Sequence, residues 1–310
     1  MTPVSHTPRL DCDRPGVLFV GLSTVDVLYG VEGVPGANEK VVAAWQDLCA
    51  GGPATNAALA CAHLGTRTTL ATAVGTHPFA AIVGGDLARR GVALVDLASG
   101  LEIAPPVSSV LIDVQTGDRA VVSTNAAAWP RQLAPIPEAA FEDVRVLLVD
   151  GHHLESAIQA ARRARQSGIT TVMDGGSWKP GLPDLLAHID IAVCSADFQP
   201  PGCEGPDTVA AFLARHGVRA TAISRGAEAI LCWDGRHVTS VPVPTVRVVD
   251  TLGAGDVLHG AFCHYLAAAP GRFLDAIEAA GAIASRSCAH RGARAWMDEA
   301  VDPASRGPST

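Results

Sequence analysis

The sequence predicts an α/β protein in which a mostly parallel sheet carries helices on both faces. Short apolar strands alternate with amphipathic helices along the chain, as they do in βαβ units. The strands are continuous apolar runs, which is typical of strands buried on both faces. With 310 residues, of which 48% are hydrophobic and 17% charged, the chain is long and apolar enough to bury a large core.

The first expected elements are two buried strands and a helix. The strands cover residues 16–22 and 144–150, where apolar side chains follow one another without a break. The helix covers 53–64, because Pro53 suits a first helical position and Gly65 a helix end.

The next elements repeat the same alternation. We expect helices at about 155–166 and 207–216, strands at 170–174, 189–194 and 219–224, and a hairpin over 229–243 that turns at Asp234-Gly235. This repetition supports a parallel sheet that grows by one strand per helix.

Two segments, at about 27–49 and 107–124, interrupt the rhythm with strand-like alternation of apolar and polar residues. We interpret them as hairpins that project from the main sheet as a small β lid. The chain is then one domain over 16–303 with lid segments, and residues 1–15 and 304–310, rich in Pro, Ser, Thr and Gly, are flexible tails.

Charge and composition exclude several classes of protein. The chain carries 23 Lys and Arg against 31 Asp and Glu, a net charge of −8, and no basic run that would bind nucleic acid. It has no apolar stretch long enough to cross a membrane and no signal peptide at its start. Its eight cysteines form no C-x-x-C pair, so we expect reduced thiols in a cytoplasmic protein.

The segment from Val248 to Phe262 carries the chemistry. A β-like run ends near Thr251, Gly253-Ala254-Gly255 forms a tight loop, and an amphipathic helix follows. Loop amides and the positive end of a helix then point at one place, which is an anion hole suited to the terminal phosphate of a nucleotide. Asp256 beside it is suited to take the proton of an attacking hydroxyl. Read alone, the same run is also compatible with a plain turn whose aspartate complements the helix dipole.

This segment resembles a family signature. Asp250-Thr-Leu-Gly-Ala-Gly-Asp256 is similar to the D-T-x-G-A-G-D motif of the ribokinase-like (PfkB) carbohydrate kinases, and Gly51-Gly52 before a helix is similar to their N-terminal motif. The resemblance extends over about 17–297 and is greatest to the ketohexokinase and sulfofructose kinase branches. It implies a three-layer α/β/α sandwich with a β lid, ATP as donor, Mg²⁺, and a monovalent cation such as K⁺.

The resemblance also implies roles for residues. Asp256 becomes the catalytic base, and the amides of Gly253, Ala254 and Gly255 become the anion hole. The implied sugar contacts are Asp26, Asn38, Lys40, Gly51, Gly52, Asn56 and His152. Because an arginine that holds the sulfonate in sulfofructose kinase corresponds to His152 here, we do not expect an anionic sulfonate substrate. His152 and His153 are also compatible with ordinary loop residues.

The expected nucleotide contacts depart from the family pattern. Ser224 and Gly226 occupy the place of the T-x-G-x-x-G loop, with Ala229 in place of its second glycine. Asp197 is the nearest carboxylate to the altered N-x-x-E motif, where it would reach Mg²⁺ through water. Thr251 completes the ATP contacts with Gly253 and Gly255, and adenine is expected beside the helix at 279–287.

Together these features predict ATP-dependent phosphorylation of a hydroxymethyl group of a sugar, such as a ketose. A homodimer that pairs its lids is expected, because a lid of this kind exposes an edge and an apolar face. Two alternatives stay open: a nucleoside kinase of the same fold, with Trp45 as a candidate for stacking on the base, and a non-catalytic sugar-sensing protein.

Overall fold

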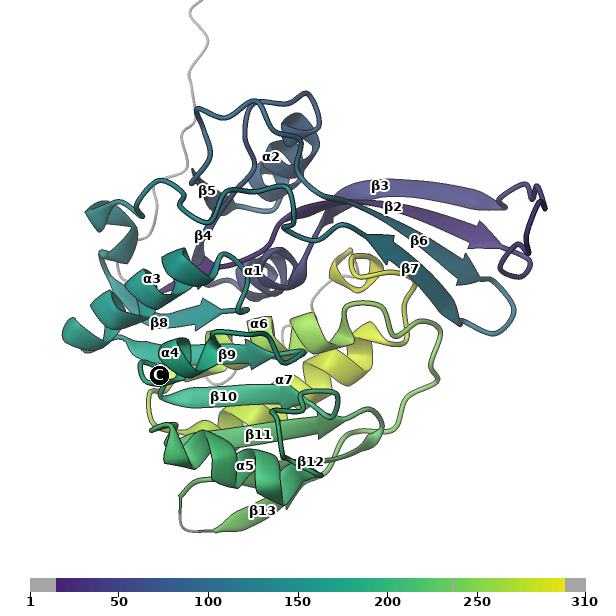
Figure 1. The fold of residues 1–310 in the computed structure, drawn as a ribbon. Helices are drawn as coiled ribbons and strands as arrows, with labels where there is room; N and C mark the ends of the chain where they lie inside the picture. Colours follow the sequence, from purple (N-terminus) through teal and green to yellow (C-terminus); the bar gives the residue numbers. More distant parts are fainter. Residues whose placement is uncertain (1–14, 236, 299–310) are drawn as a thin grey trace, which may run out of the picture.

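The computed structural model describes residues 15–235 and 237–298, which form two sheets and the helices around them (Figure 1). The large sheet has nine strands in the order β13-β12-β11-β10-β9-β8-β1-β4-β5. Its strands are β1 (Gly16–Val20), β4 (Arg67–Thr72), β5 (Val92–Asp96), β8 (Val144–Val149), β9 (Thr170–Gly175), β10 (Ile191–Ser195), β11 (Ala220–Arg225), β12 (Glu228–Trp233) and β13 (Val238–Val241).

Neighbouring strands from β5 to β11 are parallel, whereas β12 and β13 join as antiparallel strands at one edge. A parallel neighbour requires a crossover that brings the chain back, so helices come to lie on the sheet. The carboxyl ends of β8, β9, β10 and β11 therefore share one edge of the sheet.

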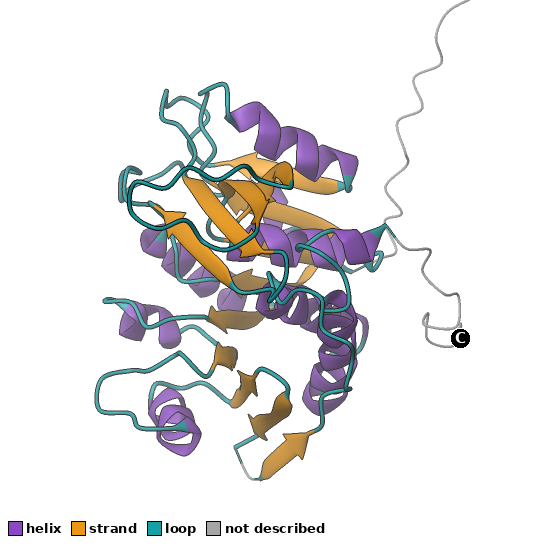
Figure 2. Ribbon diagram, turned by 90° about the vertical axis from the view of Figure 1, so that its right-hand side faces the viewer, coloured by secondary structure: helices purple, strands orange, loops and turns teal. Residues whose placement is uncertain are grey.

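Helices cover both faces of the large sheet (Figure 2). One face carries α1 (Pro53–His63), α2 (Ala80–Arg89), α6 (Ala254–Ala268) and α7 (Phe273–Ser287). The other carries α3 (Leu154–Gln166), α4 (Leu182–Leu186) and α5 (Pro206–Arg215). Each face has its own buried apolar cluster, so the three layers form one continuous body. Two short 3₁₀ turns, Glu138–Phe141 and Ala295–Met297, complete the described elements.

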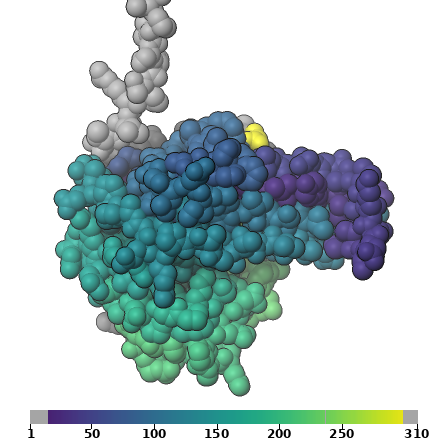
Figure 3. Space-filling model, turned by 45° about the horizontal axis from the view of Figure 1, so that its top comes forward, coloured from purple at the N-terminus to yellow at the C-terminus, as the bar shows by residue number. Residues whose placement is uncertain are grey.

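The second sheet is the lid. Its order is β3-β2-β6-β7, with β2 (Thr24–Val31), β3 (Trp45–Gly51), β6 (Val107–Asp113) and β7 (Arg119–Ser123). It extends from the rounded body as a separate blade (Figure 3). Leu28, Val110 and Ile112 form a small core on the side that faces Leu252.

The α/β prediction and the β lid are confirmed, with differences in detail. β4, α2, β5 and α4 were not expected, and β2 begins at Thr24, before the predicted lid segment. The expected tails lie outside the described residues, except for Pro15. No helix in the described part of the chain has the length and hydropathy needed to span a membrane. The seven described cysteines are free thiols.

Candidate active site

The loop before α6 is shaped by a glycine. Gly253 has a φ of 74°, and a Cβ at this position would lie 2.9 Å from the Cβ of Ala293. The preceding Asp250 is buried, and its two carboxylate oxygens accept the amides of Leu252 and Gly292, each at 2.8 Å. The loop is thus fixed from behind at the first turn of α6, where the Ala254 amide donates to the carbonyl oxygen of Thr251 at 3.3 Å and the amides of Gly255 and Asp256 follow. These amides have no partner within the helix, so they suit an anion.

The structure brings Asp256 against Asn56 of α1. The Asn56 amide nitrogen donates to Asp256 Oδ2 at 2.6 Å, and Arg294 Nη2 donates to Asn56 Oδ1 at 2.8 Å. Loss of hydration and the negative charge of Asp174 raise the pKa of Asp256 to about 7. A carboxylate with a pKa near neutrality is well matched to proton transfer from a hydroxyl.

Asp26 lies on β2, where the lid leaves the body. Thr24 Oγ1 donates to Asp26 Oδ1 at 2.6 Å, and burial raises the pKa of Asp26. A Cβ on Gly51 of the adjacent strand β3 would lie 1.9 Å from the Asp26 carboxylate. Gly51 is therefore needed to leave room for this side chain. The charge of Arg294 acts on both Asp26 and Asp256, so the two predicted carboxylates flank the same cation.

The start of α1 is held by Asp150, a residue that the sequence analysis did not select. The Asp150 carboxylate accepts the amides of Leu22, Ala54 and His152 at 2.8, 3.2 and 2.9 Å. Gly52, the N-cap of α1, has a φ of 96°, and a Cβ there would lie 2.3 Å from the carbonyl oxygen of Leu22. Together these contacts fix the helix that presents Asn56.

His152 lies partly buried at the carboxyl end of β8, close to the charges of Asp150, Lys179 and Asp174. Burial lowers its pKa, and burial lowers the pKa of the adjacent His153 to about 4. Both rings are therefore neutral at pH 7.

Two predicted sugar contacts are not brought to this place. Asn38 and Lys40 are exposed in the loop 32–44, which joins β2 to β3 at the outer end of the lid (Figure 1). Asp26 lies near the opposite end of β2.

Three of the predicted nucleotide contacts, Asp197, Ser224 and Gly226, lie at the carboxyl ends of β10 and β11. Ser224 Oγ donates to the carbonyl oxygen of Cys194 at 3.3 Å, and Gly226 is the exposed turn between β11 and β12, with a φ of 63°. Asp197 is exposed just beyond β10. Thr251 Oγ1 accepts a hydrogen bond from Arg119 Nη1 of the lid at 2.8 Å, which joins the lid to the loop before α6.

Arg294 is a central residue that the sequence analysis missed. It donates to the carbonyl oxygen of Ala50 at 2.7 Å as well as to Asn56, and its Nε lies 3.8 Å from Asp86 Oδ2. No local pattern marks it, because the residues that it joins come from β3, α1 and α2. His259 was also missed, although its position three residues after Asp256 places both on one face of α6.

The described residues contain no group of three or more His, Cys, Asp or Glu side chains that could hold a metal ion. A Mg²⁺ ion that accompanies a nucleotide commonly takes its ligands from phosphate oxygens and water together with one or two carboxylates. The exposed carboxylate of Asp197, on the same edge as Ser224, fits a contact through water.

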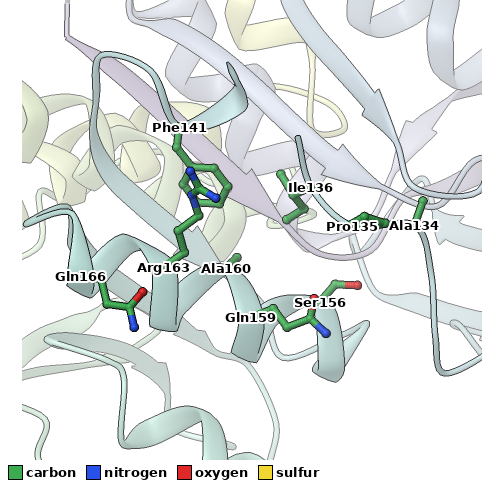
Figure 4. Close-up of a pocket in the computed structure, with 9 residues that line it drawn as sticks. All are labelled: Ala134, Pro135, Ile136, Phe141, Ser156, Gln159, Ala160, Arg163 and Gln166. Carbon is green, nitrogen blue, oxygen red and sulfur yellow. The ribbon is translucent and has the colours of Figure 1, made fainter. Parts of the chain in front are cut away.

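A hollow between residues 134–141 and α3 lies apart from the candidate site and is lined by other residues (Figure 4). Its one cation, Arg163, lies over the ring of Phe141 at 4.9 Å and pairs with Glu138 at 2.9 Å. These contacts hold the guanidinium at the wall of the hollow, and none of the predicted site residues is among the residues that line it.

The fold is that of the ribokinase-like enzymes. A ribokinase from Thermotoga maritima superposes with a TM-score of 0.76 at 19% identity, over 91% of this chain and 95% of that one. The Arabidopsis thaliana ribokinase solved with ribose and ATP gives a TM-score of 0.69 at 19% identity, over 90% and 94% of the two chains. By sequence, ribokinase of Arabidopsis thaliana is 23% identical over 269 residues, which are 82% of this chain and 71% of that protein.

The family is defined by the sequence as a whole. Residues 15–300 match the model of the pfkB family of carbohydrate kinases, and the chain belongs to that family. The predictions of a PfkB-type carbohydrate kinase and of a ribokinase-like fold are confirmed.

Proposed function

We propose that the chain transfers the γ-phosphoryl group of ATP to a hydroxymethyl group of a neutral sugar, with Asp256 as the base. The observation that carries this proposal is the position of Asp256. It lies in the first turn of α6, the amide of Asn56 orients its carboxylate, and its pKa is raised to about 7. Asp256 takes the hydroxyl proton, the freed oxygen bonds to the γ-phosphorus, and the bond from that phosphorus to ADP breaks.

The anion hole of Gly253, Ala254 and Gly255 holds the phosphoryl group during transfer. Backbone amides are suited to this task, because they stabilise developing negative charge without moving. Mg²⁺, carried by ATP, supplies charge neutralisation on the phosphates. We assign no described residue to a monovalent cation such as K⁺.

Asp26 is the proposed sugar clamp, since one carboxylate can accept bonds from two hydroxyls. The family and the Arabidopsis ribokinase solved with ribose and ATP support a sugar of this kind. The neutral state of His152 argues against an anionic sugar, because a neutral imidazole supplies no cation for a sulfonate. Ketoses and ribose are the first candidates.

A nucleoside kinase is the second candidate, and Trp45 argues against it. The indole lies over Gly30, where a Cβ would approach Nε1 to 2.0 Å, and Arg291 lies 5.1 Å from the ring centre. With these neighbours the ring is a part of the lid rather than an open platform for a base. A purely sugar-sensing protein would have no need of Asp256.

The test is ATP consumption with a panel of ketoses, ribose, sugar acids and adenosine. We expect ADP to form only with a neutral sugar, since closure of the lid keeps water from replacing the hydroxyl. Activity should fall as the pH drops below about 7, because protonated Asp256 accepts no proton. ATP hydrolysis that is equally fast without any sugar, with no phosphorylated product, would contradict the proposal.

A further inference from the structure

The hydrogen bonds of His259 indicate which form its imidazole ring takes. Nδ1 lies 2.7 Å from the carbonyl oxygen of Gly255, and Nε2 lies 2.9 Å from the carbonyl oxygen of Val193. A carbonyl oxygen only accepts hydrogen bonds, so each ring nitrogen must carry a hydrogen. Both nitrogens carry a hydrogen only in the imidazolium form.

Asp174 supplies the opposite charge. Its Oδ1 lies 3.5 Å from His259 Nε2, and both side chains are 6% exposed. A buried cation is costly unless it is paired and hydrogen-bonded, and here both conditions are met. Because Asp174 belongs to β9 and His259 to α6, this pair connects the sheet to the helix.

The charges of other titratable groups also influence the pair of His259 and Asp174. Asp256 faces His259 from its own helix, and Asp150, His152 and Lys179 act on Asp174 from the ends of β8 and β9. Burial raises the pKa of the Cys194 and Cys263 thiols, and the negative charge of Asp174 raises it further, so both thiols stay neutral. Arg294 acts on Asp256 from the far side. His259 is thus paired with Asp174 and also acts on the charge of Asp256.

We propose that His259 is a permanent imidazolium that positions the base of the reaction, by fastening the first turn of α6 to β10 and by favouring the ionised form of Asp256. The proposal rests on the role of Asp256 proposed above. His259 itself touches no substrate in this arrangement; it acts through the helix turn and through its charge.

The positioning role of His259 follows from its hydrogen bonds to the carbonyl oxygens of Gly255 and Val193. Gly255 immediately precedes Asp256, and Val193 belongs to β10, so one ring connects the catalytic turn to the sheet. The electrostatic part follows from the positions of the charges. Asp174 alone would disfavour a second carboxylate nearby, and the imidazolium offsets this repulsion.

The protonation state can be measured without any reference to catalysis. We suggest ¹⁵N NMR of the full chain labelled at histidine, with His259→Gln used to assign the signals. An imidazolium gives two nitrogens that both carry hydrogen, and a neutral ring gives one that does and one that does not. We expect the imidazolium form of His259 at pH 7 and at pH 8. A neutral ring at pH 7 would overturn the proposal even if Asp256 proves to be the base.

The effect on Asp256 is tested by the pH dependence of kcat/KM. On the acidic side of this profile, kcat/KM falls as Asp256 becomes protonated; we call this part the acidic limb. In His259→Gln the amide still donates a hydrogen bond but carries no charge, so the acidic limb should move about one pH unit higher. In Asp174→Asn a negative charge is removed, so the limb should move to lower pH. These opposite shifts distinguish charge from a general loss of packing.

His264→Gln is the matched control. His264 lies on the same helix, bonds Thr66 Oγ1 at 2.6 Å, and is neutral because burial lowers its pKa to about 4. Its replacement should leave the acidic limb where it is in the wild type. An unshifted limb in His259→Gln would refute the electrostatic role. If instead Asp256→Asn keeps full activity while the NMR signal is that of an imidazolium, the proposed base is wrong and the buried cation remains.

Discussion

At the scale of the residue, the site depends on consecutive hydrogen bonds that run from Arg294 through Asn56 to Asp256. Arg294 holds the oxygen of the Asn56 amide, so the nitrogen of that amide must point at Asp256. Asn56 was predicted as a sugar contact, but in this structure both ends of its amide bond protein. The base is thus oriented by a residue 200 positions away in the sequence, and that residue by another 238 positions away from it.

Asp26→Asn should raise KM for the sugar about 10-fold or more and lower kcat less, because the change weakens a clamp and leaves the base intact. Steady-state kinetics with the preferred sugar measures both values. Asp47→Asn is the control, since Asp47 is an exposed acid on the neighbouring strand β3 whose carboxylate accepts the adjacent amide of Leu48 at 2.8 Å. Equal effects in the two variants would argue against a specific role for Asp26.

Gly51→Ala should also weaken sugar binding, because the new methyl group would lie on the Asp26 carboxylate and displace it. We expect a rise in KM together with a drop in the free energy of unfolding of about 1–3 kcal/mol, as overpacked sites show. Gly84→Ala is the matched control: Gly84 is in α2, its Cβ would meet nothing within 4 Å, and a helix gains about 1 kcal/mol from alanine. A variant Gly51→Ala with wild-type KM would mean that Asp26 is not held as described.

At the scale of the element, the lid has two unlike faces. The inner face packs Leu28, Val110 and Ile112 toward Leu252, whereas the outer face carries Leu48 and Val122, which are 47% and 74% exposed. Leu48 pairs with Val27, Val27 with Ser109 and Ser109 with Val122, so these residues form one row across the sheet. We propose that this outer row packs against the lid of a second copy.

Leu48→Lys combined with Val122→Lys should convert a dimer into a monomer, because two buried ammonium groups would have to lose their hydration. Sedimentation at micromolar concentration measures the state of the wild type and the variant. Val238→Lys is the control, since Val238 is 58% exposed on β13, outside the lid sheet. A wild-type chain that sediments as a monomer would refute lid pairing.

Some elements of the fold could be predicted from the sequence, and others could not. Continuous apolar runs revealed β1 and β8, and glycine and proline marked the ends of α1. β4 was missed because it begins with Arg67-Thr-Thr, and α2 because Gly84-Gly85 interrupts its pattern. The loop before α6 was predictable because its residues are adjacent in the sequence. Arg294 was not, because its partners meet it only in the folded chain.

At the scale of the whole molecule, the large sheet aligns two helix N-termini at one edge. Asp150 at the end of β8 holds the start of α1, and Asp174 at the end of β9 pairs with His259 of α6. The lid then closes this edge through Arg119, which bonds Thr251. We propose that residues 16–303 act as one kinase domain, with body and lid as the two sides of a single site.

The most direct test of this account is Asp256→Asn, measured by steady-state kinetics and by calorimetric titration with ATP. The amide keeps the shape of the side chain but accepts no proton, so kcat should fall about 10²- to 10⁴-fold. ATP affinity should stay within a few-fold of the wild type, because the anion hole consists of backbone amides. A variant that keeps more than about half of the wild-type kcat would place the base elsewhere and contradict the mechanism.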